Sequence, residues 1–240
     1  MGKPKEEKSV SRSIIPPDMT DKNYLVQEAF TSLRINLQFA VQKQGCKRII
    51  ITSAKQSEGK STCASNLSIV YSQSNSKTLL LDCDMRKPTL HKLFQCRSIP
   101  GLSDVLGGLC QLEEAVQDTE YKNLRVLFSG TIPPNPAELL GSERMGALLE
   151  RLSESYDTII MDTPPINIVS DALALSPMVD GVILVARVDY STHAETNKAI
   201  ASLEFAKAKT LGILLNDIVY KKSGRYGKYY NRYYYEYKEK

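Results

Sequence analysis

The chain has 240 residues, of which 42% are hydrophobic and 24% charged, and its net charge is +4. This length suits one domain with a well-buried core. The longest apolar runs, such as residues 181–186, are far shorter than the roughly 20 residues of a transmembrane helix, so we expect no membrane span. The five cysteines show neither a C-x-x-C nor a Cys/His metal spacing, which favours reduced cytoplasmic thiols over disulfides or a thiolate metal site.

The two ends of the chain differ in composition from its middle. Residues 1–20 are charged, lack an apolar signal core and end near a Pro-Pro break, which predicts a flexible leader. Residues 220–240 hold seven Lys/Arg, two Glu and eight of the thirteen tyrosines, whereas the rest of the chain is near neutral. Because this stretch has no aliphatic residue to pack, we predict disorder over residues 221–240. One folded domain is then expected over residues 21–220.

Helical and extended patterns alternate along the predicted domain. The first element is a helix over residues 21–42 with one apolar stripe at every fourth residue, formed by Leu25, Ala29, Leu33 and Leu37. Short apolar runs then predict strands at residues 48–53, 78–83, 124–130, 157–163, 180–186 and 211–217. Longer segments between them predict helices at residues 60–73, 142–155 and 191–208.

The strand composition indicates the fold class. Most of the predicted strands lack polar alternation, so both faces of the sheet are expected to be covered, as in a parallel sheet. Helices between such strands are typical of a single α/β domain with a mostly parallel central sheet and helices on both faces. Folds of this kind bind ligands at the carboxyl ends of the strands.

The stretch ITSAKQSEGKST, residues 51–62, joins a predicted strand to a predicted helix through a loop of small residues. In such a loop backbone N–H groups and the helix end face a phosphate chain, a lysine neutralises its oxygens and a hydroxyl binds magnesium. Ala54 replaces the first glycine of G-x-x-x-x-G-K-[ST], so a polar loop with a chance Gly-Lys pair is the alternative. The predicted nucleotide-binding residues are Ser57, Glu58, Gly59, Lys60, Ser61 and Thr62.

Three aspartates lie at the ends of two predicted strands. Asp82 and Asp84 follow an apolar run, two apart, and project to the same side if the chain is still extended there. Asp162 ends another run, where a carboxylate can hold a magnesium-bound water. One such aspartate is usually a helix cap or turn residue, but three beside a phosphate loop favour a shared Mg·ATP. The predicted magnesium ligands are Ser61, Asp82, Asp84 and Asp162.

Taken together, these motifs are similar to those of one family. The segments SEGKST, LLLDCDMRKP and IIMDTPP resemble the Walker A, A′ and B motifs of the bacterial protein-tyrosine kinases (BY-kinases), which accompany capsule and exopolysaccharide synthesis. GTIPPNPAELL, residues 130–140, looks like that family's G-x-x-x-P-N-P-x-E-L-L segment. The likeness covers residues 24–240 and is greatest to the Gram-positive type, in which the kinase and its membrane adaptor are separate chains.

The resemblance implies a P-loop protein of the deviant Walker A type that uses ATP and Mg²⁺ to phosphorylate protein tyrosines. It implies that Lys60 stabilises the transferring phosphoryl group and that Asp162 completes the metal shell. Asp82 is implied as the base that accepts the tyrosyl proton, although the spacing does not decide between Asp82 and Asp84. In related ATPases the asparagine of a strand like GILLN contacts adenine, which assigns that role to Asn216.

The tyrosine-rich end suits a substrate of the kinase itself. A flexible tether gives a tyrosine hydroxyl a high local concentration at the active site without a peptide groove. The predicted phosphoacceptors are Tyr226, Tyr229, Tyr230, Tyr233, Tyr234, Tyr235 and Tyr237. A nucleic-acid-binding tail, in which bases stack on tyrosines and phosphates meet lysines, and a solvated extension without a role are the alternatives. We expect no nucleic-acid partner.

The resemblance also implies partners. The chain is expected to be cytoplasmic and recruited to the inner face of the cell membrane by the end of its adaptor, to act on tyrosine substrates of polysaccharide synthesis, and to form a homo-oligomeric ring. The family's ring contact, E-x-x-R-x-x-R, is present as Glu28 and Arg34, with Thr31 in place of the middle arginine. The alternative is that Glu28 and Arg34 simply lie on the solvent face of the helix.

Three further cationic residues each have more than one predicted role. Lys55 lies five residues before Lys60, the spacing of the lysine that reaches across the dimer in deviant Walker A ATPases of DNA partition and division-site placement. Lys55 fits that role or a plain loop surface. Arg86 and Arg187 fit phosphate or inter-subunit contacts, or exposed surface. The alternatives to a kinase are thus a partition-type dimeric ATPase and a nucleotide-dependent scaffold.

Overall fold

A mostly parallel sheet forms the centre of the part of the chain that the structure, a computed structural model, describes: residues 14–17 and 24–218. Its strands are β1 (Lys47–Ser53), β2 (Thr78–Asp82), β3 (Val116–Asp118), β4 (Leu124–Leu127), β5 (Thr158–Asp162), β6 (Gly181–Arg187) and β7 (Thr210–Asn216). Within these residues the order is β3-β4-β2-β5-β1-β6-β7, and only the β3–β4 pair is antiparallel. The predicted α/β fold class is confirmed.

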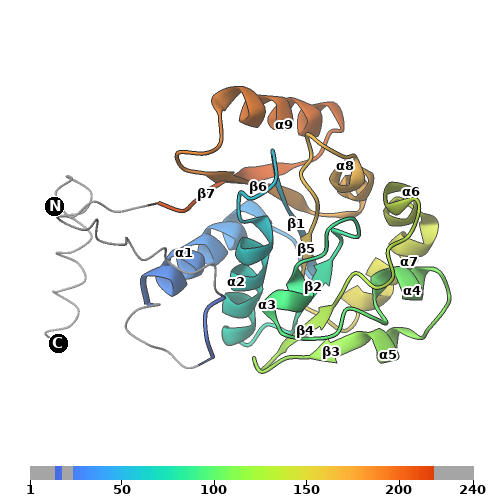
Figure 1. Cartoon of the computed structure of the whole chain (residues 1–240). Helices are drawn as coiled ribbons and strands as arrows, with labels where there is room; N and C mark the ends of the chain where they lie inside the picture. The colour runs from blue at the N-terminus through green and yellow to red at the C-terminus, as the bar shows by residue number, and fades with distance from the viewer. Residues whose placement is uncertain (1–13, 18–23, 219–240) are drawn as a thin grey trace, which may run out of the picture.

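Helices cover both faces of the sheet and close a hydrophobic core on each side (Figure 1). One face carries α1 (Tyr24–Ala40), α2 (Lys60–Gln73) and α3 (Leu90–Leu93). The other face carries α4 (Leu102–Leu106), α5 (Leu112–Ala115), α6 (Pro136–Leu140), α7 (Glu143–Ser153), α8 (Asp171–Leu175) with the 3-10 turn Ser176–Met178, and α9 (His193–Phe205). Along β1, Ile49 and Ile51 face the first core and Ile50 the second, because successive strand side chains alternate.

The strand order brings the predicted site residues together. β5 lies between β1 and β2, and the register places Asp162 of β5 opposite both Asp82 of β2 and Ile51 of β1. Because the three strands are parallel, their carboxyl ends meet at one edge of the sheet. The loop from β1 to α2 leaves from that same edge, so the predicted phosphate loop and aspartates are neighbours.

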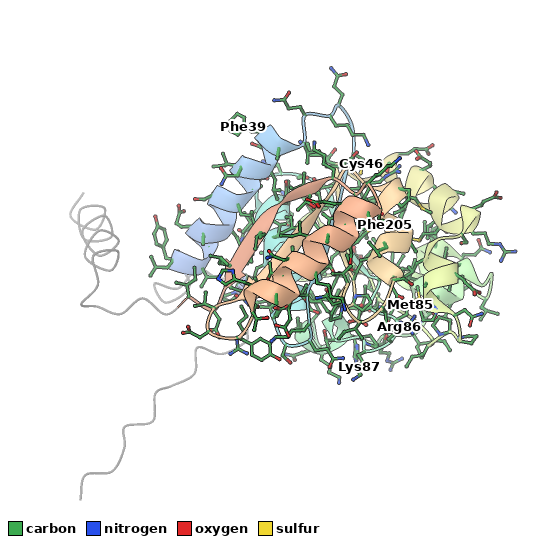
Figure 2. All side chains as sticks on the ribbon, turned by 90° about the horizontal axis from the view of Figure 1, so that it is seen from above. Phe39, Cys46, Met85, Arg86, Lys87 and Phe205 are labelled. Carbon is green, nitrogen blue, oxygen red and sulfur yellow. The ribbon has the colours of Figure 1, made fainter. Side chains whose placement is uncertain are left out.

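Helix α1 departs from its predicted stripe. Leu25 is 44% exposed and Ala29 is also exposed, whereas Phe30, Leu33 and Leu37 pack on the core. A spacing of four residues drifts around a helix of 3.6 residues per turn, so the buried row follows a mixture of three- and four-residue steps. The outer surfaces of α1 and α9 carry the labelled Phe39 and Phe205, which are 72% and 92% exposed (Figure 2).

The remaining sequence predictions of elements hold with shifted ends, but short elements were missed. β4 ends at Leu127 rather than at residue 130, where the chain turns. The three-residue strand β3 and the helices α3, α4, α5, α6 and α8 were not predicted. These pieces have four or five residues in each helix, too few for a periodic pattern to stand out.

Part of the predicted leader is attached to the domain. Ile15 is only 3% exposed, its N–H donates to Asn66 Oδ1 at 2.8 Å, and its carbonyl accepts from the Tyr121 hydroxyl at 2.6 Å. The expectation of a flexible leader is therefore wrong for residues 14–17. The remainder of the leader and residues 221–240, with all candidate tyrosines, lie outside the described residues.

None of the helices that the structure describes has the length and apolar character needed to cross a bilayer.

Candidate functional site

The phosphate-loop candidate contains a glycine whose backbone conformation and close neighbour disfavour any side chain. Gly59 has φ 91° and ψ 17°, in the left-handed region that side chains disfavour. A Cβ at Gly59 would lie 2.0 Å from Asn216 Nδ2. That same amide donates to the Glu58 carbonyl at 2.9 Å. Asn216, predicted to contact adenine, is thus placed by the end of β7 directly against the loop.

The side chain of Glu58 braces the loop. It is fully buried, its Oε2 accepts from the Lys55 N–H at 2.8 Å, and its Oε1 accepts from the Ser191 hydroxyl. The carboxylate predicted to bind the nucleotide is therefore used within the protein, which leaves the main-chain N–H of Glu58 for a ligand. Ser57 is exposed with φ 65° beside it, and Thr62 is half-buried on α2.

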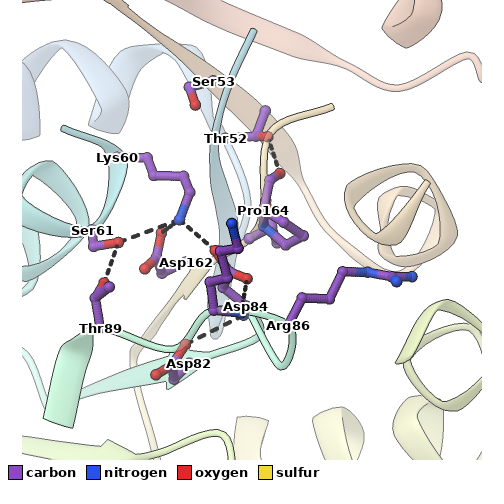
Figure 3. Close-up of polar contacts among 12 residues, drawn as sticks. Thr52, Ser53, Lys60, Ser61, Asp82, Asp84, Arg86, Thr89, Asp162 and Pro164 are labelled. Atoms are coloured by element: carbon purple, nitrogen blue, oxygen red, sulfur yellow. Dashed lines mark hydrogen bonds and ion pairs between the residues drawn. The ribbon is translucent and has the colours of Figure 1, made fainter. Parts of the chain in front are cut away.

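Lys60 gathers the predicted catalytic residues around its ammonium group (Figure 3). Its Nζ lies 2.7 Å from Asp84 Oδ2, 3.6 Å from Asp162 Oδ1 and 3.4 Å from Ser61 Oγ. Burial acts to lower the pKa of Lys60, but the charges of Asp162 and Asp84 outweigh it and raise that pKa above its ordinary value. Lys60 therefore stays a cation in a site that is otherwise acidic.

Asp82 and Asp162 are carboxylates without enough partners. Both are fully buried, and Asp82 Oδ2 and both oxygens of Asp162 have no hydrogen-bond partner among the described residues. Burial, and then the neighbouring charges of Asp162 and Asp84, raise the pKa of Asp82 well above its ordinary value. Burial also raises the pKa of Asp162, against the opposing charge of Lys60. Lys60, at 3.6 Å from Asp162 Oδ1, offsets only part of this buried negative charge, and a bound cation would stabilise the rest.

The donor set fits Mg²⁺ bound together with a nucleotide. Within the described ranges no three His, Cys, Asp or Glu side chains are arranged to hold a metal by themselves. Mg²⁺ commonly takes one or two carboxylates and completes its octahedron with phosphate oxygens and water. Asp162, Asp82 and the Ser61 hydroxyl offer such oxygens, whereas Asp84 is engaged by Lys60. The orphaned oxygens are thus of the hard type that Mg²⁺ prefers.

Arg86 is committed to an internal ion pair. Its Nε and one terminal nitrogen donate to both oxygens of Asp171, the first residue of α8, at 3.0–3.3 Å. Asp171 is fully buried. Figure 3 shows Arg86 pointing away from Lys60, although Asp84 is only two residues earlier. The Arg86 side chain is still 40% exposed, as the surface alternative expects, and its predicted phosphate or inter-subunit contact stays a prediction.

Lys55 and Arg187 also find partners in their own chain. Lys55 Nζ lies 2.9 Å from Glu195 Oε2 and 4.2 Å from the centre of the Tyr190 ring. The hydrogen bond from Lys55, with those from Thr192, lowers the pKa of Glu195 to about 2. Arg187 pairs with Asp217 at 2.7 Å. Lys55 is thus half-buried in an ion pair of its own chain, and its two predicted roles stay open.

Sequence reasoning missed several residues that shape this site. Asp171 and Glu195 carry helix-start signals, because each lies in the first turn of a helix after Ser170 or Thr192. Those signals indicate a cap but give no hint of a distant arginine or lysine partner. Ser191 and Thr89 have no motif that would have singled them out.

The fold and the site define an α/β P-loop protein that binds a nucleotide. The AAA domain family matches residues 46–210 of the chain. The septum site-determining protein MinD of Pyrococcus horikoshii, solved as a complex with Mg-ADP, superposes with a TM-score of 0.60 at 26% identity, over 71% of this chain and 70% of that one.

Two other proteins are more similar to this chain than MinD is, and they narrow the class of protein to which it belongs. The chain is 42% identical over 211 residues to tyrosine-protein kinase YwqD of Bacillus subtilis (strain 168), covering 88% of this chain and 89% of that protein. The kinase domain of Escherichia coli tyrosine kinase ETK superposes with a TM-score of 0.81 at 33% identity, over 93% of this chain and 88% of that one. The chain belongs to the bacterial tyrosine-protein kinases, as its motifs predicted, and is a tyrosine-protein kinase.

Proposed function

We propose that this kinase transfers the γ-phosphoryl group of ATP to tyrosines of its own C-terminal segment and thereby regulates capsule or exopolysaccharide synthesis and export. The observation that carries the proposal is the buried group of Lys60, Asp82, Asp84 and Asp162 at the phosphate loop, with carboxylate oxygens left for a cation. The acceptors proposed are Tyr226, Tyr229, Tyr230, Tyr233, Tyr234, Tyr235 and Tyr237.

Each residue of the site has a proposed task. ATP supplies the phosphoryl group and Mg²⁺ offsets its charge. When ATP binds, the ammonium group of Lys60 moves from Asp84 to the phosphate oxygens. Ser61 and Asp162 hold the magnesium ion, and Asp82 and Asp84 help to position it. Asp82 accepts the proton of the attacking phenol, because its raised pKa and unpaired Oδ2 suit a general base.

The backbone of the loop and one amide complete the proposed nucleotide site. The N–H groups from Ser57 to Thr62 face the phosphates, as expected at a helix N-terminus. Asn216 holds the loop through the Glu58 carbonyl and lies at the side from which the base would be contacted.

Charge gives the modification a proposed consequence. Residues 220–240 carry a charge of +5, from seven Lys/Arg and two Glu. Each phosphate adds about −1.5 to −2 charges, so two or three modifications cancel the charge of the tail and further ones invert it. Phosphorylation would then switch the tail between a cationic and an anionic state, which changes the surfaces that it can meet.

Partners and location are part of the same proposal. A membrane adaptor recruits the cytoplasmic kinase to the inner face of the membrane, and a homo-oligomeric ring presents the tail of one subunit to the next. Glu28 is exposed on α1 and available for such a contact. Arg34 is half-buried and lies near Tyr71 of α2. Burial raises the pKa of Tyr71 to about 12, and the charge of Arg34 acts in the opposite direction. Other tyrosine proteins of polysaccharide synthesis are proposed as further substrates.

Phosphotyrosine mapping tests the proposal. The purified full chain is incubated with Mg·ATP, with and without an adaptor segment, and analysed by mass spectrometry. We expect phosphotyrosine between residues 226 and 237 in the wild type and in Lys198→Met, an exposed lysine of α9. We expect none in Lys60→Met. ATP hydrolysis with nucleotide-driven dimers but no phosphotyrosine would instead support the partition-type ATPase, and binding without turnover would support a scaffold.

A further inference from the structure

Thr89 occupies a helix-capping position without capping the helix. It is the residue before α3, where a threonine oxygen normally accepts a hydrogen bond from an N–H of the first turn. The Thr89 side chain makes no such bond. Its hydroxyl instead donates to Ser61 Oγ at 3.0 Å, across 28 residues of sequence (Figure 3).

Ser61 therefore receives two donors in this structure. A hydroxyl oxygen has two lone pairs and one proton, and Ser61 Oγ accepts from Thr89 at 3.0 Å and from Lys60 Nζ at 3.4 Å. The Lys60 contact is the weaker of the two, since Lys60 makes a 2.7 Å bond to Asp84. A metal ion that approaches Ser61 can take the lone pair facing Lys60 and leave the Thr89 bond intact.

The segment from Asp82 to Thr89 thus reaches the phosphate loop at two points. Asp84 pairs with Lys60, and Thr89 bonds Ser61, the next residue of α2. Between them, Asp84 Oδ1 accepts from the Lys87 N–H at 3.0 Å, which keeps the turn closed. A shift of this segment would move both contacts together.

We propose that Thr89 is a positioning residue of the magnesium site, whose hydroxyl holds Ser61 Oγ with one lone pair directed toward the metal. The inference rests on the proposed role of Ser61 as a magnesium ligand. Thr89 itself stays outside the metal shell and acts only through Ser61. Because Thr89 is exposed and water can replace it in part, its effect is that of a single hydrogen bond.

Metal binding to the full chain tests this without reference to kinase activity. Mn²⁺ is titrated in the presence of saturating ADP, and the unbound Mn²⁺ is counted by electron paramagnetic resonance. We expect Thr89→Val to raise the Mn²⁺ dissociation constant about 2- to 10-fold, the size of one hydrogen bond. Thr89→Ser should bind like the wild type, because it keeps the hydroxyl. ADP affinity in EDTA should not change.

Three further variants separate the possible causes. Ser61→Ala should weaken Mn²⁺ binding, and adding Thr89→Val to it should have no further effect, because the two residues act through one oxygen. Ser142→Ala is the control, because Ser142 does cap α7 through the Met145 N–H. It should lower the melting temperature and leave Mn²⁺ binding unchanged, whereas Thr89→Val, at an exposed position that water can reach, should lower the melting temperature less than Ser142→Ala does and weaken Mn²⁺ binding.

The outcomes that contradict the inference are distinct from those that contradict the proposed function. If Ser61→Ala weakens Mn²⁺ binding but Thr89→Val does not, or if Thr89→Ser weakens it as much as Thr89→Val, the role of Thr89 is wrong and that of Ser61 stands. If Ser61→Ala binds Mn²⁺ like the wild type, Ser61 is not a metal ligand and both assignments fall.

Discussion

Replacing Asp82 by asparagine should stabilise the nucleotide-free protein while it destroys transfer. Asp82 is fully buried, its Oδ2 has no hydrogen-bond partner within the described chain, and it lies opposite Asp162 in the sheet. Asparagine has nearly the same shape, carries no charge and can donate to the unpaired oxygens of Asp162. The substitution removes a buried charge that the protein holds for its ligand.

The magnitude follows from the cost of a buried polar group without a partner. That cost is about 1 to 3 kcal/mol, so Asp82→Asn should raise the free energy of unfolding by about that amount, or about 2–4 °C of melting temperature for each kcal/mol in a chain of this size. Loss of a general base should lower phosphotyrosine formation about a hundredfold or more.

The stability that Asp82→Asn gains should increase as the pH rises. The pKa of Asp82 in the folded protein lies well above its ordinary value of 3.8, so between those two values the folded protein binds the proton more readily than the unfolded chain does. Stability is therefore lost as the pH rises through that window. The advantage of asparagine should be larger at alkaline pH and shrink as the pH falls below the ordinary pKa of 3.8, where the carboxyl of aspartate is mostly protonated in both states.

Urea unfolding in EDTA at several pH values measures this effect. Asp104→Asn is a matched control, because Asp104 is also buried but its Oδ2 accepts from the Gly101 and Thr131 N–H groups at 2.8 and 3.2 Å. That variant should lose about 1 to 2 kcal/mol, since charge-assisted bonds are lost. If Asp82→Asn is destabilised like the control, or if its gain is the same at every pH, the reasoning about the unpaired carboxylates is refuted.

Three other predictions concern residues outside the group of Asp82, Asp84 and Asp162. Asp171→Ala removes the buried acceptor of Arg86, whose side chain is 40% exposed and can be hydrated, so the loss in urea unfolding should be about 1 to 3 kcal/mol; an unchanged free energy of unfolding would contradict the pair's importance. Lys55→Ala should change phosphotyrosine formation by less than about threefold, because a partly exposed ion pair with Glu195 contributes little; loss of transfer as complete as in a Lys60 variant would support the cross-dimer role. Phe128→Ala, in the core beside β2, should cost about 3–5 kcal/mol, and an unchanged melting temperature would contradict its packing role.

The alternation of strands and helices was predictable because it depends on local patterns. Runs such as residues 181–186 are apolar throughout, as a strand covered on both faces requires. The approach of Asp82 to Asp162 was predictable for a related reason, since parallel strands end at one edge and each aspartate ends a strand. The prediction of the buried stripe of α1 was wrong because the stripe depends on the phase of the helix. The strand β3 was missed because three residues are too few to show a period.

By itself the sequence determined the class of fold, the phosphate loop, the acids and the family, because each is written in contiguous residues or in strand ends. Only the tertiary structure decided which partner each charged side chain takes. Arg86 meets Asp171, Lys55 meets Glu195, and Glu58 turns inward to Ser191. These partners lie 85 to 140 residues apart, and no local pattern encodes such a pairing, because it arises only when separate loops are brought to the same edge of the sheet.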